Sequence, residues 1–135
     1  MYARIKNLTG IYIFLLVAIV FLVDHSATQP LFRFIYKIPF GDKIGHFCLM
    51  GFFSFLLNLA LNAKAIKIGR IHFPLGSLIV LFVVVVEEFS QLWVRGRTFD
   101  AGDLLFDLAG IVLFGELARL VVRRRGLTIR RGEQA

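Results

Sequence analysis

Ionisable and amide side chains enter otherwise apolar sequence at three places along this chain. The first place holds Asp42, Lys43 and His46, the second holds Glu87, Glu88 and Gln91 with Arg97 after them, and the third holds Asp103 and Asp107. Within each place, side chains recur at a spacing of three or four residues, which puts them on a common face of a helix. Each helix would therefore carry one polar stripe near one of its ends.

The residue types predict the chemistry of such a site. Arg97 presents a planar fork that suits phosphate or carboxylate. His46 can carry protons near neutral pH, and Glu88 could act as an acid or a base, so these two are the candidates for catalysis. Carboxylates such as Asp103, Asp107 and Glu88 could also hold a divalent cation. No nucleophile–base pair or metal motif follows from the spacing, so we assign no reaction, metal or cofactor. The predicted binding residues are Asp42, Lys43, His46, Glu88, Gln91, Arg97, Asp103 and Asp107.

A structural ion network is the alternative explanation of the same residues. Asp103 would then cap a helix, Lys43 and Arg97 would neutralise neighbouring carboxylates, and Asp107 would be protonated and hydrogen-bonded. Charges at lipid depth are costly and usually face the interior of a helix bundle or a water-filled cavity. Because polar groups from three helices would meet at one depth, we favour a functional site over a network.

The elements that must position these groups follow from composition. The chain has 135 residues, of which 58% are hydrophobic and 19% charged, and its mean hydropathy is +0.77. Soluble domains average about 45–50% apolar and about 25% charged residues, so a soluble domain is disfavoured. Four apolar runs, at residues 8–24, 44–62, 73–94 and 103–122, are each long enough to cross a bilayer core of about 30 Å as a helix. We predict an all-α, four-helix transmembrane bundle in one domain over residues 1–135.

Lys and Arg are distributed unevenly between the two sides of such a bundle. Eleven of them lie in the N-terminus, the connection between the second and third spans and the C-terminal end, and five lie on the other side. The positive-inside rule then places both termini in the cytoplasm and the polar stripes at the outer face of a bacterial inner or plasma membrane. The net charge of +7 reflects this topology and attraction to anionic lipids, so we expect no nucleic-acid partner.

The segments outside the spans have their own character. Residues 24–41 interleave aromatic and basic side chains, which predicts an interfacial segment, such as a short helix lying flat on the membrane. The first run could instead be a signal peptide because Arg4 and Lys6 precede it, but no small-residue cleavage site follows, so an uncleaved span is favoured. Residues 123–135 are expected to form a basic cytoplasmic tail. The single cysteine, Cys48, excludes an internal disulfide.

Two smaller features predict helix contacts. Gly45, Gly51 and Gly110 would let helices approach closely. Glu116 and Arg119 are three residues apart and should pair near the cytoplasmic surface.

The polar residues, taken in order, resemble the pattern of the VanZ-like family of small integral membrane proteins. The segment from Asp42 to Phe47 is similar to the family's DKxxHF signature. The remaining matches keep the family spacing across about residues 10–115: Glu88, Gln91, Arg97, Asp103 and Gly110. The family usually has Asn where this chain has Asp107, which adds an ionisable group. The resemblance implies a membrane protein linked to the cell envelope, with a role in the response to glycopeptide antibiotics, since the family is named after a member associated with teicoplanin resistance. It implies no reaction and no cofactor.

Three functions compete on this basis. The first is binding, with or without processing, of an anionic envelope component such as a lipid or a lipid-linked glycan phosphate at the outer-face cluster. The second is a non-enzymatic accessory or scaffold subunit with a membrane protein partner, suggested by small size and many Phe residues. The third, transport of ions or small solutes, is disfavoured because four spans give little room for a pathway. Membrane lipids are expected partners under all three.

Overall fold

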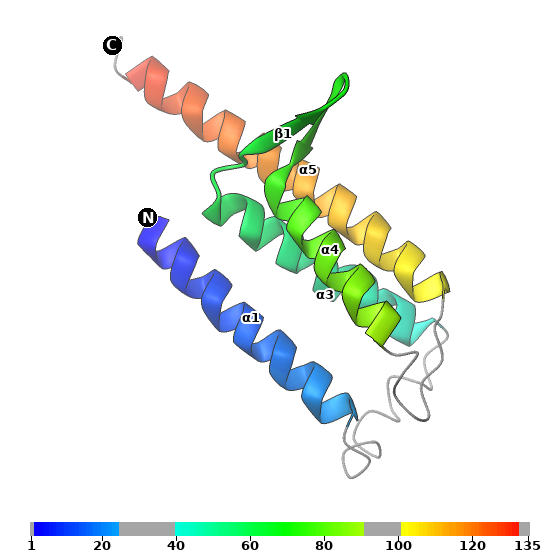
Figure 1. Cartoon of the computed structure of the whole chain (residues 1–135). Helices are drawn as coiled ribbons and strands as arrows, with labels where there is room; N and C mark the ends of the chain where they lie inside the picture. Colours follow the sequence, from blue (N-terminus) through cyan, green and yellow to red (C-terminus); the bar gives the residue numbers. More distant parts are fainter. Residues whose placement is uncertain (1, 25–39, 91–100, 133–135) are drawn as a thin grey trace.

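Four helices make up most of the described chain in a computed structural model of the protein (Figure 1). Residues 2–24, 40–90 and 101–132 are described, with side chains over 4–17, 40–89 and 101–125. The helices are α1 (Tyr2–Asp24), α3 (Gly41–Ala60), α4 (Leu75–Ser90) and α5 (Ala101–Gly132). The predicted predominance of helix is thereby confirmed. That these helices form a transmembrane bundle stays a prediction.

The helix ends differ from the expected spans in ways that local chemistry explains. Helix α3 begins at Gly41 and takes in Asp42 and Lys43 in its first turn, where a carboxylate is favoured. Helix α5 does not end near residue 122 but continues to Gly132, because arginine is a strong helix former and a run of positive charge does not by itself stop a helix. The expected interfacial segment falls on residues 25–39, which lie outside the described residues, as do residues 91–94 of the third span.

A β-hairpin that we did not predict corrects the all-α expectation. Strand β1 (Ala65–Ile68) pairs antiparallel with β2 (Ile71–Pro74), and the pair joins α3 to α4. Gly69 in the connecting turn has φ of 61°, a conformation that glycine adopts without strain. The sequence signal was present, since Ile and Phe alternate with basic residues on both sides of Gly69.

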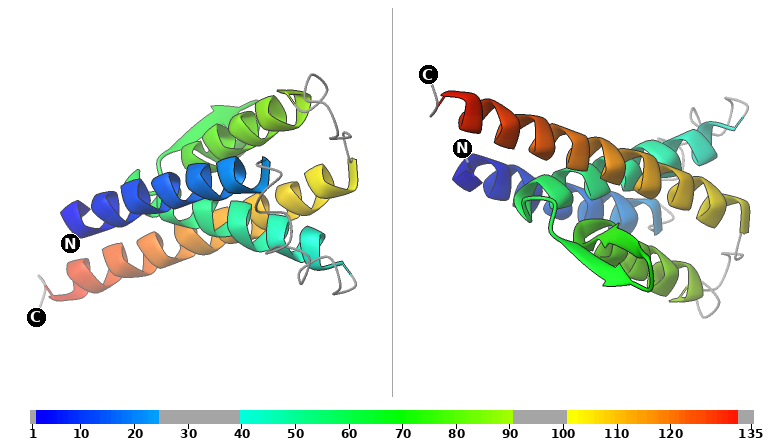
Figure 2. Two further views of the ribbon diagram at one scale, coloured as in Figure 1. Left: turned by 90° about the horizontal axis from the view of Figure 1, so that it is seen from below. Right: turned by 90° about the horizontal axis from the view of Figure 1, so that it is seen from above.

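The helices share one apolar core, in which α3 is the central element. Leu16 from α1, Phe53 from α3, Val80 and Val84 from α4 and Ile111 from α5 pack together as buried side chains. Figures 1 and 2 show the start of α1, the end of α5 and the hairpin at one end of the bundle, and the starts of α3 and α5 at the other. We call these the hairpin end and the cluster end.

Close contact between α3 and α5 depends on glycine. A Cβ atom on Gly110 would collide with the carbonyl oxygen of Phe47, and one on Gly51 would lie 2.7 Å from the ring of Phe114. The predicted close approach at Gly51 and Gly110 is confirmed. At Gly45 it is wrong, because nothing lies within 4 Å of a Cβ built there.

Most of the helical surface is apolar and faces outward. Among the described residues, α3 alone is both long and apolar enough to cross a membrane, and 33% of its most apolar 18-residue window is buried inside the structure. A core helix of a soluble protein would be mostly buried, whereas most residues of α3 are only partly buried or exposed.

Candidate functional site

Two cation–carboxylate pairs join the start of α3 to the start of α5. Lys43 Nζ lies 2.9 Å from Asp103 Oδ1, and the two side chains are only about one-fifth exposed. One turn further along both helices, His46 Nδ1 lies 3.2 Å from Asp107 Oδ2. The structure therefore brings together four of the predicted site residues from two different segments.

His46 lies between two carboxylates. Its Nδ1 faces Asp107, and its Nε2 lies 3.8 Å from Asp103 Oδ2, too far for a hydrogen bond but close enough for an ion pair. A neutral imidazole has a single N–H, so His46 can be attracted to both carboxylates at once only as the doubly protonated cation. The arrangement fixes the orientation of the ring and can hold a proton at either nitrogen.

Glu88 adds a buried carboxyl group from α4. Its side chain is 1% exposed, like that of Asp107, and it lies within electrostatic range of His46, Asp103 and Asp107. Its Oε2 atom has no hydrogen-bond partner among the residues that the structure describes. An unpaired buried carboxyl oxygen is costly, and such groups in native proteins often serve a ligand or a proton. Glu87, its neighbour, is the less buried of the two.

The crossing of α3 and α5 explains why these groups meet. Gly110 packs against the backbone of Phe47, the residue after His46, and a Cβ at this position would collide with it, so the close approach of the two helices here depends on glycine. Asp107 lies three residues before Gly110 on α5, so it is held at the level of His46. The glycine therefore positions the ion pairs without taking part in them.

Some predicted residues are not in the described cluster. Asp42 lies in the first turn of α3 but makes no ion pair with another described residue. Gln91 and Arg97 lie outside the described residues. Over the described ranges, no group of three His, Cys, Asp or Glu side chains is arranged to hold a metal ion, so these residues give no support to the divalent-cation hypothesis.

A second polar cluster, buried between the end of α3, the start of α4 and α5, was missed by the sequence analysis. Asn58 Nδ2 donates to Ser77 Oγ at 2.9 Å and to the Ser54 carbonyl at 2.9 Å, and Asn58 Oδ1 accepts from the Gly76 N–H at 3.0 Å. Ser54 Oγ also donates to the Ile111 carbonyl at 3.0 Å. This cluster is internally satisfied and ties α3, α4 and α5 together, which fits a structural role. Its only sequence signal was small polar residues inside apolar runs.

Comparison with known proteins identifies the family. Neither the curated proteins nor the solved structures contain a match to the chain. The VanZ/LLP1 family model matches residues 8–122, which is most of the sequence and takes in every residue of the cluster. The chain therefore belongs to the VanZ/LLP1 family.

Proposed function

We propose that the chain is an integral membrane protein that crosses the bilayer four times with both termini in the cytoplasm. We further propose that the polar cluster at its outer face binds a phosphate-bearing component of the cell envelope, either a lipid or a lipid-linked glycan phosphate. Any part in the response to glycopeptide antibiotics remains an expectation from the family resemblance.

Outward-facing apolar side chains on every described helix support the membrane part of the proposal. Helices α1, α4 and α5 each expose at least five large apolar residues, for example Phe14 at 72%, Phe82 at 69% and Leu105 at 63%, and α3 exposes Ile44 and Phe52. Contiguous apolar surface of this kind requires an apolar environment or a partner. Lipid around the bundle would give all of these apolar side chains an apolar environment.

The observation that carries the binding proposal is that His46 lies between Asp103 and Asp107, near the buried Glu88 Oε2, which has no hydrogen-bond partner among the described residues. A carboxyl group buried without a partner is least costly as the neutral acid. With Glu88 neutral, Lys43 and His46 offset Asp103 and Asp107. Glu87, which lies within electrostatic range of His46, adds one more carboxylate.

In this proposal, Arg97 offsets the remaining negative charge. It precedes Asp103 by six residues in the sequence, and its guanidinium has a planar fork suited to phosphate. A neutral Glu88 would offer an O–H donor to the same phosphate, and His46 could give or take its proton.

Binding of a polyprenyl phosphate, compared with the uncharged polyprenol, tests the proposal. The full chain in lipid nanodiscs should bind the phosphate and not the alcohol, because only the phosphate engages Arg97 and Lys43. Arg97→Gln should weaken binding by about tenfold, the effect of losing one charge-assisted hydrogen-bond pair.

Lys6→Gln is the matched control, since it removes one exposed cation at the other end of the bundle. Equal losses for Arg97→Gln and Lys6→Gln, or equal binding of phosphate and alcohol, would contradict the proposal. Circular dichroism and gel filtration on each variant separate loss of binding from loss of folding.

A structural network within an accessory or scaffold subunit is the second candidate, and the mutual pairing of Lys43 with Asp103 and His46 with Asp107 favours it. It predicts that the chain purifies from mild detergent in fixed stoichiometry with another membrane protein and does not bind the polyprenyl phosphate. A lone monomer that binds the phosphate would exclude it.

A further inference from the structure

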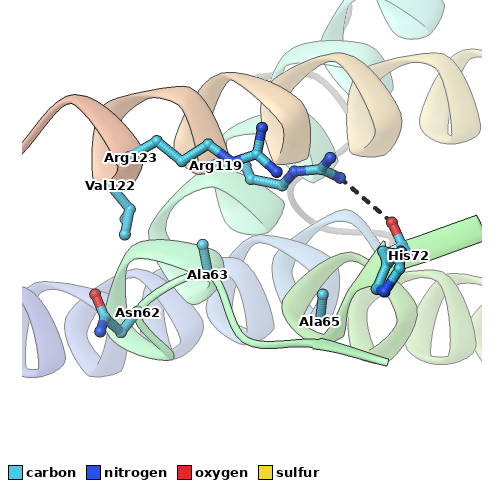
Figure 3. A pocket seen from close by; sticks show the side chains of 7 residues that line it. All are labelled: Asn62, Ala63, Ala65, His72, Arg119, Val122 and Arg123. Atoms are coloured by element: carbon cyan, nitrogen blue, oxygen red, sulfur yellow. Dashed lines mark hydrogen bonds between the residues drawn. The ribbon is translucent and has the colours of Figure 1, made fainter. Parts of the chain in front are cut away.

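A basic pocket lies at the hairpin end, away from the cluster (Figure 3). Its volume is about 390 Å³, and its walls come from the turn after α3, the hairpin and α5. His46 in the second turn of α3 belongs to the cluster, whereas the pocket begins at Asn62 beyond the end of α3 at Ala60, and the fourteen residues from His46 to Ala60 correspond to about 21 Å of helix. The pocket is therefore separate from the cluster described above.

Two arginines from successive turns of α5 form one wall of the pocket. Arg119 Nη1 donates to the His72 carbonyl at 3.3 Å and to Glu116 Oε1 at 2.9 Å, which confirms the predicted pair with Glu116. Both bonds use Nη1. Among the described residues, the Nη2 and Nε donors of Arg119 therefore make no side-chain hydrogen bond and can donate to a ligand. Arg123 lies beside Arg119 in Figure 3 and lines the same pocket.

No carboxylate lines this pocket, and the surrounding sequence is basic. Residues 61–74 contain Lys64, Lys67 and Arg70 and no Asp or Glu. On α5, Glu116 is the last carboxylate before the end of the helix. Pockets of this charge near the cytoplasmic ends of membrane helices suit anionic lipid headgroups.

The hairpin adds an apolar face that no described element covers. Its register places Ile66 opposite Phe73 and Ile68 opposite Ile71, so all four side chains share one face, and they are between 37% and 60% exposed. The opposite face carries Ala65 and His72, which line the pocket. A two-stranded hairpin with an uncovered apolar face is marginal in water, whereas the boundary between headgroups and acyl chains satisfies such a face.

We infer that this pocket binds the phosphate of an anionic phospholipid, and that the apolar face of the hairpin lies in the same membrane leaflet. Arg119 and Arg123 supply planar forks for the phosphate oxygens. The hairpin sets the depth of the pocket in the membrane. Its apolar face would lie among the acyl chains, and its opposite face borders the pocket.

Native mass spectrometry of the full chain with phosphatidylglycerol and phosphatidylcholine tests the pocket. One phosphatidylglycerol should bind more tightly than phosphatidylcholine. Arg123→Gln should weaken phosphatidylglycerol binding by about tenfold. Arg124→Gln, the neighbouring exposed arginine that does not line the pocket, should change binding by less than about twofold.

Two outcomes would overturn this inference. Equal losses for the two arginine variants would mean general attraction to the basic end of α5 and no pocket. Competition by millimolar inorganic phosphate would assign the site to free phosphate, while failure to compete supports a lipid headgroup.

Tryptophan quenching tests the position of the hairpin. In a Trp93→Phe background, Ile68→Trp should be strongly quenched by brominated phosphatidylcholine in vesicles, because residue 68 is on the apolar face. Lys67→Trp, on the opposite face, should be quenched much less. Equal quenching at both positions, or none at either, would contradict insertion of the hairpin.

Discussion

At the scale of single residues, Asp107 has the most constrained surroundings in the cluster. It is 1% exposed, and its carboxylate faces His46 Nδ1 through both oxygens, at 3.2 and 3.3 Å. The family usually carries Asn at this position, and an Asn side-chain oxygen accepts the same hydrogen bond without a charge. We therefore expect this position to require an acceptor for His46 and not a negative charge.

Substitution of Asp107 separates these two properties. Asp107→Leu should lower the free energy of unfolding by about 1–3 kcal/mol, because the partly buried ring of His46 loses its acceptor. Asp107→Asn should stay within about 1 kcal/mol of the wild type because it keeps that acceptor. Unfolding in mixed detergent micelles measures both, and equal losses would show that charge, not hydrogen bonding, holds His46.

Helical spacing alone was sufficient to find Lys43, His46, Asp103 and Asp107, because residues three or four apart share a face and charges within apolar runs stand out. It could not pair Lys43 with Asp103, since that depends on how two helices cross. It missed Ser54, Asn58 and Ser77 because small polar residues barely change hydropathy. Their role follows only from contacts across three helices.

At the scale of elements, the crossing of α3 and α5 at Gly110 should control the cluster. Gly110→Ala places a methyl group against the Phe47 carbonyl and forces the helices apart, which should cost about 1–3 kcal/mol. It should also weaken binding at the cluster, because Asp103 and Asp107 would move away from Lys43 and His46.

Gly45→Ala is the matched control for this prediction. It is the same substitution in the same pair of helices, but nothing lies within 4 Å of the added methyl group. It should be neutral or stabilise the protein by up to about 1 kcal/mol through helix propensity. The free energies of unfolding of the two variants test this prediction. Similar destabilisation by both would contradict a helix crossing that depends on Gly110.

The polar cluster of Asn58 should hold α4 to α3. Asn58→Leu removes the acceptor of the buried Gly76 N–H and the amide donor to Ser77 Oγ, so we expect a loss of about 2 kcal/mol or more in the free energy of unfolding. Asn7→Leu, on the exposed side of α1, should change it little. If Asn58→Leu unfolds no more easily than Asn7→Leu, the cluster does not contribute to stability.

The apolar runs in the sequence predicted the helices, but they could not predict the hairpin. Residues 65–74 are too short and too basic for a span, so a hydropathy scan reports only a connection. The period-two alternation around Gly69 was the relevant signal, and it is short enough to be mistaken for irregular structure. The continuation of helix α5 beyond residue 122 was not predicted either, because this segment is rich in arginine and has no apolar run.

At the scale of the whole molecule, the two ends of the bundle differ in charge. The cluster end brings Lys43 and His46 against three carboxylates, whereas the hairpin end carries the basic turn, hairpin and α5 arginines. Because α1 begins and α5 ends at the hairpin end, one orientation puts the basic residues in the cytoplasm and the cluster outside. The two proposed sites would then serve opposite leaflets.

Labelling of single cysteines tests this orientation directly. In a Cys48→Ser background, Ala101→Cys marks the cluster end and Arg70→Cys marks the turn of the hairpin, and both positions are exposed. A membrane-impermeant maleimide should label Ala101→Cys on spheroplasts and should reach Arg70→Cys only after the membrane is permeabilised. Arg4→Cys should behave like Arg70→Cys, because α1 starts at the hairpin end. The reversed pattern would put the cluster in the cytoplasm and exclude an envelope ligand on the outer face, whereas labelling of all three positions from outside would exclude a spanning bundle.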